Sequence, residues 1–240
     1  MRNLVILAII VLGAFTPALA QDELEVETKV DFFSQYIWRG QSIVDDPVAQ
    51  PSVSAFYKNF TLSVWGNLDM TNVNDNRWDI TEVDFSLDYS NYFSNEIPKI
   101  GYSIGIINYD FPNTNFDNTT EVYAGINFEM FLSPSLTIYR DIDEADGTYV
   151  SFGVSESIGW GFEGAANFGW GDGDYNKFYW GNGSDRFNDL TLSISRPIEF
   201  KGIEITPSLS YIRLIDRDLG SIGNDGNDTF VFGISLSKKF

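Results

Sequence analysis

The last twelve residues constrain the fold of this chain more than any other segment. Successive side chains of a β-strand point to opposite faces, and over 229–240 one face is largely apolar, with Phe230, Phe232, Ile234 and Leu236. In a soluble domain such a terminal strand invites unwanted pairing, whereas a closed barrel in a membrane has no free edge. We therefore expect a membrane β-barrel. A strand that stops on an aromatic residue, here Phe240, resembles the signal read by the bacterial outer-membrane assembly machinery, which we expect as a partner.

The beginning of the chain predicts export. Arg2 precedes an uncharged stretch over 4–15, and residues 18–20 read Ala-Leu-Ala. A basic start, a short apolar run and small residues at the cleavage site are typical of a secretory signal. A membrane-spanning helix needs about 20 apolar residues, which this stretch does not reach. We expect a cleavable signal peptide over 1–20, a barrel over 21–240 and localisation in the outer membrane of a Gram-negative bacterium.

Alternating segments along the chain predict an all-β fold, a single antiparallel up-and-down transmembrane barrel of twelve strands. An even strand number and strands near ~9–11 residues suit a bacterial barrel. Long connections alternate with short ones, which places the N- and C-termini on the periplasmic side. Helical periodicity is absent, because Gly, Asn, Asp and Ser interrupt every candidate window. The expected strands are 24–38, 48–57, 60–68, 80–89, 99–109, 119–130, 135–140, 148–156, 162–170, 189–196, 203–214 and 229–240.

The composition excludes several functions. The chain has no His and no Cys, so Ser–His chemistry and disulfides are unavailable, and we expect no enzyme. With 34 acidic and 15 basic residues, nucleic acid is not an expected partner. The run 172–176 lacks the Gly and Glu of a calcium loop, and no metal or cofactor site is predicted. The carboxylate pair Glu82 and Asp84 has the spacing of a glycosidase pair, but a wet lumen explains it equally well.

The parity of the strands assigns an acidic lining to the lumen. Lys29 and Lys239 are the basic residues on the same parity. A water path lined in this way favours cations and repels anions. Barrels of eight strands have an interior filled by side chains, and barrels of 16–18 strands have an open channel. Twelve strands lie between these cases, so the strand number does not decide whether the lumen is open. The pore-lining candidates are Glu27, Asp31, Glu82, Asp84, Asp88, Glu121, Glu129, Glu163 and Glu204.

The long connections hold more than half of the acidic residues. They form either a solvated anionic surface or a surface where divalent cations bridge carboxylates to lipopolysaccharide phosphates. Arg140 and Arg213, near the outer rim, could also pair with those phosphates. Outer-membrane lipid and lipopolysaccharide are therefore expected partners. The sequence leaves the oligomeric state and the course of loop 171–188 open.

Aromatic residues fall where girdles at the two membrane interfaces are expected. Tyr36 and Trp38 belong to this set near the outer rim. The other girdle candidates are Tyr57, Tyr89, Tyr109, Trp170 and Phe240.

The segment 34–42 reads Ser-Gln-Tyr-Ile-Trp-Arg-Gly-Gln-Ser, and its Tyr-x-x-Arg-Gly motif, followed by Pro47, resembles the opening of the TorF-like porins. The resemblance implies a signal peptide, one outer-membrane barrel and a channel role, with no catalytic residues. Its motif residues here are Tyr36, Trp38, Arg39 and Gly40. We interpret Trp38 as a girdle ring and Arg39 as a loop residue that pairs with Asp45 or Asp46, with a gating role for Arg39 as the alternative.

Two functions remain open from the sequence. One is a porin-like channel for passive diffusion of small hydrophilic solutes, leaning toward cations. The other is a non-conducting barrel that acts as an adhesin, receptor or envelope scaffold through its acidic extracellular loops. An inward-folded loop 171–188 would favour the channel.

Overall fold

The computed structural model describes residues 24–72, 77–94, 96, 99–220, 222 and 226–240, so the predicted signal peptide lies outside the described residues. The chain is almost entirely β-structure. In order, its elements are β1 (Leu24–Phe33), β2 (Tyr36–Trp38), β3 (Gln41–Val44), β4 (Val48–Tyr57), β5 (Phe60–Asp69), β6 (Ile80–Ser94), β7 (Lys99–Asp110), β8 (Thr119–Glu129), β9 (Ser135–Asp141), β10 (Thr148–Gly159), β11 (Phe162–Gly171), α2 (Gly173–Trp180), β12 (Arg186–Ser195), β13 (Ile198–Phe200), β14 (Ile203–Leu214), η2 (Arg217–Leu219) and β15 (Asp228–Lys239).

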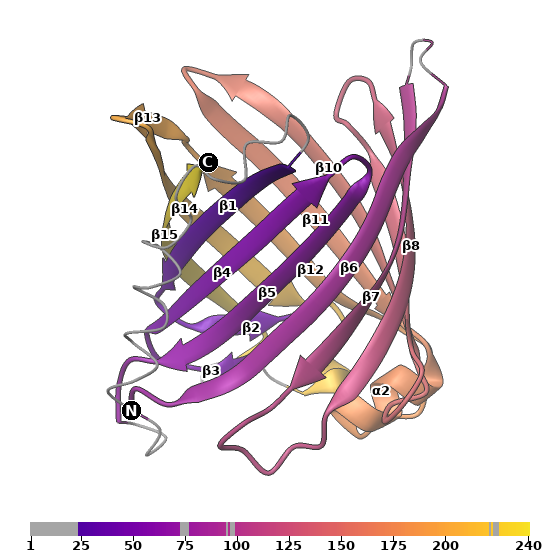
Figure 1. Cartoon of the computed structure of the whole chain (residues 1–240). Coiled ribbons are helices and arrows are strands. Elements are labelled where there is room, and N and C mark those ends of the chain that lie inside the picture. Colours follow the sequence, from indigo (N-terminus) through magenta and orange to yellow (C-terminus); the bar gives the residue numbers. More distant parts are fainter. Residues whose placement is uncertain (1–23, 73–76, 95, 97–98, 221, 223–225) are drawn as a thin grey trace.

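Twelve of these strands close into an antiparallel barrel, as the alternation predicts. Neighbours in the chain pair with each other, β1 pairs with both β4 and β15, and β12 pairs with β14 to complete the ring. The strand β13 is a short extension that pairs with the start of β14. Closure leaves no free edge of the kind that promotes aggregation. Figure 1 shows the inclined strands around the lumen.

Among the described residues, no helix has the length and apolar character needed to cross a bilayer.

The two ends of the barrel differ. The first and last strands meet at one end, where the backbone N–H of Phe240 donates to the carbonyl of Val26 at 2.9 Å. This turn end also carries the short connections, such as 58–59 and 160–161. The opposite, loop end carries 70–72, 77–79, 111–118 and 172–185, including α2 (Figure 1). The side of the membrane on which each end lies stays a prediction.

The wall has an apolar outer face and a polar inner face. Outward side chains such as Leu62, Phe85 and Phe232 are exposed, as expected for strands in contact with lipid. The inward face carries many small polar residues, and the Ser54 and Ser63 hydroxyls are 2.7 Å apart across β4 and β5. The register therefore produces the alternation that specifies a membrane barrel.

One predicted strand is wrong in its second half. The segment 24–38 was expected to form a single strand, but β1 ends at Phe33, and β2 and β3 form a separate two-stranded sheet. Trp38 pairs with Gln41, and the two residues between them, Arg39 and Gly40, have φ of 46° and 81°. Two positive φ values in a two-residue loop are typical of a type I′ hairpin turn. The turn reverses the chain, and the hairpin lies inside the barrel (Figure 1).

The course of loop 171–188, which the sequence leaves open, includes the short helix α2. Asp172 is its N-cap, accepting a hydrogen bond from the backbone N–H of Tyr175 at 2.9 Å. Gly181 ends it in the left-handed conformation, with φ of 70°. Both are common helix boundary signals. Eight residues are too few for a clear helical period, so the pattern did not reveal the helix.

Candidate functional site

The lumen is filled at the loop end. Hairpin β2–β3 lies within the barrel there, and every strand of the ring contributes an inward residue that is buried around it. These buried residues are Asp31 (β1), Val48 (β4), Asn67 (β5), Glu82 (β6), Tyr109 (β7), Glu121 (β8), Asp141 (β9), Tyr149 (β10), Gly171 (β11), Asp189 (β12), Leu214 (β14) and Val231 (β15). We refer to residues 34–44 together with α2 as the plug.

An ion pair joins the tip of the hairpin to the barrel wall. The two terminal nitrogens of Arg39 donate to the two carboxylate oxygens of Glu121 on β8, each at 2.7 Å. The Tyr109 hydroxyl on β7 donates to the same carboxylate at 2.8 Å. The side chains of Arg39 and Glu121 are 10% and 1% exposed. A bidentate pair of this kind is among the stronger polar contacts in proteins.

Aromatic rings surround the Arg39 guanidinium. Its central carbon lies 4.4 Å from the ring centroids of Trp38, Tyr139 and Tyr149. The Tyr175 ring of α2 is 5.8 Å away. Ring faces attract cations, and the attraction increases when water is excluded. The guanidinium is therefore held by a carboxylate at its edge and by rings over its faces.

The other side of the hairpin packs on apolar wall residues. Ile37 contacts the cluster formed by Ile212, Leu214 and Val231 on β14 and β15. A Cβ atom at Gly40 would lie 2.8 Å from a Leu214 methyl carbon and 2.9 Å from the Asp189 Cβ. Only glycine fits this close approach at positive φ. The Gly of the Tyr-x-x-Arg-Gly motif is thus required by both the turn and the contact.

Helix α2 covers the hairpin from the loop end. The Gln41 amide donates to the carbonyl of Tyr179 at 2.6 Å, and the Tyr179 ring lies 5.1 Å from Trp38. Tyr175 is fully buried against Tyr149, with ring centroids 5.3 Å apart. Loop 171–188 therefore folds inward, the arrangement that we expect of a channel.

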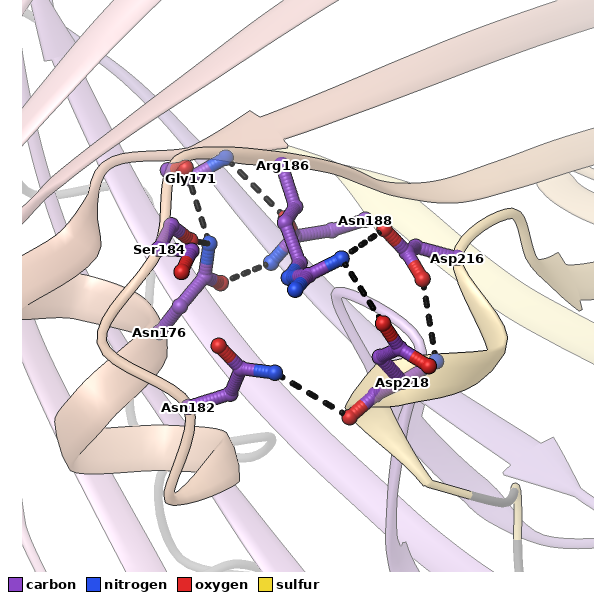
Figure 2. Close-up of polar contacts among 8 residues, drawn as sticks. All are labelled: Gly171, Asn176, Asn182, Ser184, Arg186, Asn188, Asp216 and Asp218. Carbon is purple, nitrogen blue, oxygen red and sulfur yellow. Dashed lines mark hydrogen bonds and ion pairs between the residues drawn. The ribbon is translucent and has the colours of Figure 1, made fainter.

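A buried amide pair fastens α2 to the wall (Figure 2). Asn188 donates to the side-chain oxygen of Asn176 at 2.7 Å and accepts from the backbone N–H of Gly171 at 3.1 Å. Asn176 in turn donates to the carbonyls of Gly171 and Ser184, both at 2.9 Å. Both amides are fully buried, so these bonds replace those to water. They position the helix on β11 and β12.

A second contact in Figure 2 connects β12 to the loop that contains η2. Arg186 pairs with Asp216 and with Asp218, the latter at 3.3 Å. The Asn182 amide donates to the Asp218 carbonyl at 3.3 Å. Hydrogen bonds from the Asp218 backbone N–H and from Arg186 lower the pKa of Asp216. The loops after β11 and β14 are therefore joined over the same end of the barrel.

The nine pore-lining candidates share the inward parity of their strands, but their surroundings differ. Glu121 is buried beneath Arg39 rather than facing an open path, and Asp31 pairs with Lys29 at 3.0 Å. Glu27 lies 3.8 Å from Lys239, and Glu129 lies 3.3 Å from Lys99. Glu82 and Asp84 lie beside the plug. Asp88 accepts a hydrogen bond from the Tyr123 hydroxyl. The last two candidates, Glu163 and Glu204, are exposed.

The girdle prediction was wrong for three residues. Tyr109 is buried in the lumen, and Tyr36 and Trp38 belong to the plug, where their rings contact Trp65 and Tyr109. Their aromatic character suits packing around the hairpin, which composition alone does not distinguish from packing at a membrane interface. The other four candidates lie on the outward parity, as a girdle requires: Tyr57, Tyr89, Trp170 and Phe240.

The expected partner of Arg39 was also wrong, because Arg39 pairs with Glu121 rather than with Asp45 or Asp46. Sequence separation hid this contact, which spans 82 positions. The local signal was Gly40 directly after Arg39, because a two-residue loop with glycine favours a tight hairpin over a continuous strand.

The acidic loops hold no metal cluster in the part of the chain that the structure describes. Arg140 lies on the outward parity near the loop end and pairs with Asp146 and, at 3.7 Å, with Asp172. Its pairing with lipopolysaccharide phosphates stays a prediction.

Toward the turn end, inward side chains of the barrel are accessible to solvent. Ser155 on β10 and Ala165 on β11 face each other on the inward parity and are exposed. On the neighbouring strands β12 and β14, inward positions are also small, as in the Ser193–Ser210 and Ser195–Ser208 pairs. The site thus consists of a polar vestibule that is closed at one end by a charged and aromatic plug. Such an arrangement can hold water and polar solutes on the open side of the plug.

Twelve antiparallel strands around a polar lumen define a porin-type β-barrel. The KdgM porin in complex with disordered oligogalacturonate matches with a TM-score of 0.53 at 8% identity, covering 90% of this chain and 99% of that chain. The NanC porin matches with a TM-score of 0.54 at 14% identity, covering 90% and 100%. At these identities the likeness concerns the fold. The chain belongs to the family of bacterial proteins of unknown function (Gcw_chp), whose model matches residues 18–212. No curated protein matches the sequence. The TorF-like name stays an interpretation of the motif.

Proposed function

We propose that this protein is an outer-membrane channel for small hydrophilic solutes whose loop end is closed by a movable plug. The observation that carries the proposal is the position of hairpin β2–β3, folded into the lumen of a porin-type barrel and held there by the Arg39–Glu121 pair. Lipid contact along the apolar outer face supports placement in the outer membrane.

The contacts of the plug support movement. The hairpin is held to the wall by side-chain contacts. The main ones are the Arg39–Glu121 pair with the wall rings around it, the Gln35 amide, which donates to Thr229 at 2.7 Å, and the apolar cluster around Ile37. Backbone hydrogen bonds of β2 and β3 are made with each other rather than with the barrel strands. The hairpin can therefore leave the lumen without breaking the ring of strands.

Cation preference is part of the proposal. Among the described residues, no basic side chain pairs with Glu82 or Asp84 on β6. Moving the plug would also free the Glu121 carboxylate. Carboxylates between low-dielectric walls concentrate cations and repel anions.

Planar-bilayer recording across a KCl gradient tests the proposal. Stepwise currents with a reversal potential on the cation side are expected, and the substitutions Glu82→Gln and Asp84→Asn should shift that potential toward zero. Anion-selective currents would overturn the cation preference but would still support a channel. Absence of current at any voltage from both the folded wild type and the folded Arg39→Ala variant would overturn the channel.

The alternative of a non-conducting adhesin, receptor or scaffold has one observation in its favour, the packed loop end with its acidic connections. Absence of current from the wild type and from plug variants alike would favour this second function.

A further inference from the structure

The wall of the lumen contains an organic-cation site that the hairpin fills with its own side chain. We infer that Glu121, Tyr139 and Tyr149 bind solutes bearing a guanidinium group, and that Arg39 occupies this site as an internal ligand when the channel is closed. The inference rests on the proposed function in one respect only, that the hairpin leaves the lumen.

The three site residues belong to the barrel rather than to the plug. Glu121, Tyr139 and Tyr149 lie on the adjacent strands β8, β9 and β10. Tyr139 pairs across the strands with Tyr149, and both ring centroids lie 4.4 Å from the guanidinium carbon. When the hairpin moves, Trp38 moves with it, whereas the carboxylate and these two rings remain.

The geometry selects the chemical class. Glu121 accepts two hydrogen bonds of equal length, 2.7 Å, from the two terminal nitrogens of Arg39. A guanidinium presents two parallel N–H groups that match a carboxylate, and it is weakly hydrated. A sodium ion or a primary ammonium offers no such pair of donors. Ring faces add attraction for a flat, delocalised cation.

The site is also preorganised by its neighbours. The Tyr109 hydroxyl bonds Glu121 at 2.8 Å, and the Tyr149 hydroxyl bonds Asp189 at 2.8 Å. The carboxylate and one ring are therefore fixed from outside the site, and Asp189 adds a second negative charge behind that ring. Fixed partners reduce the entropy lost when a ligand binds.

The test is calorimetric titration of methylguanidinium into protein purified in detergent. The Arg39→Ala variant vacates the site and should bind methylguanidinium at least about tenfold more tightly than the wild type, as a bidentate, ring-covered cation contact implies. The variant Arg39→Ala/Glu121→Gln should lose this binding. Equal heats from these two variants would overturn the inference. Arg39→Gln replaces Arg39→Ala if the latter does not fold.

Two controls sharpen the result. Arg140→Ala removes an arginine from the outer face and should bind no more methylguanidinium than the wild type. Urea has a similar planar shape without charge, and it should give no saturable heat with Arg39→Ala. Equal binding of urea would overturn the inference. The titration does not depend on current, so the two proposals can fail separately. A barrel that binds methylguanidinium but conducts no current supports the guanidinium site and contradicts the channel. A barrel that conducts current but does not bind methylguanidinium supports the channel and contradicts the guanidinium site.

Discussion

Arg39 and Glu121 lie 82 positions apart in the chain and form a bidentate ion pair inside the barrel, with both contacts at 2.7 Å. This pair joins the tip of an inserted hairpin to the wall strand β8. Neither partner has another charged partner of opposite sign among the salt bridges of the described residues. Each is therefore the direct hydrogen-bonded counter-ion of the other.

Removing one partner should leave a buried charge. We expect Glu121→Gln to lower the free energy of unfolding by about 3 kcal/mol, because a buried ion without its partner loses both solvation and attraction. Urea unfolding in lipid vesicles measures this quantity. Arg140→Ala, which breaks an exposed pair with Asp146, is the matched control and should cost about 1 kcal/mol or less. Equal effects of the two substitutions would contradict a buried pair.

Gly40→Ala should displace the hairpin. Its Cβ would meet Leu214 at 2.8 Å and Asp189 at 2.9 Å, at a φ of 81°. We expect faster proteolysis within 34–44 and more frequent channel openings than in the wild type. Gly202→Ala is the matched control, since φ there is 75° and a Cβ would meet no atom within 4 Å. The Gly202→Ala variant carries only the free-energy cost of a left-handed conformation, about 1–2 kcal/mol. If it changes proteolysis and channel opening as Gly40→Ala does, the close contact of Gly40 with Leu214 and Asp189 has no role.

The amide pair beneath α2 should be sensitive to truncation. Asn188→Ala removes a donor to Asn176 and an acceptor for Gly171 in a fully buried setting. We expect a loss of about 1–3 kcal/mol of stability, since the partner groups are left unsatisfied. Hydrogen exchange should show earlier opening of 173–180 than in the wild type. Asn59→Ala is a control at the turn end, where one exposed hydrogen bond to Ser90 is lost. If hydrogen exchange in α2 is unchanged in both variants, Asn188 does not hold the helix in place.

The parts of the fold that follow from alternation could be predicted, and the parts that depend on long-range contact could not. Apolar residues at every second position, such as Phe230 and Phe232, identify the outward face of a strand in the sequence, because the lipid-facing side chains of a membrane barrel are apolar. Residues 34–38 continue the same pattern, so the exit of the chain into the lumen after Phe33 left no periodic trace. Only the Arg39–Gly40 turn indicated it.

The plug was missed for a related reason. An aromatic residue near a strand end suits a membrane interface and a packed lumen equally, so Trp38 and Tyr109 were assigned to the girdle. Glu121 was correctly placed on the inward face, but its burial depends on a residue from another part of the chain. Sequence parity fixes which way a side chain points and gives no information on what fills the space in front of it.

We propose above all that the hairpin closes a conducting barrel. Single-channel recording of the wild type and of Arg39→Ala at the same voltage and salt tests it most directly. We predict that the wild type is mostly closed, with brief openings, and that Arg39→Ala is open for a much larger fraction of the time. Equal open fractions for the two proteins, or silence from both when each is folded, would contradict the claim.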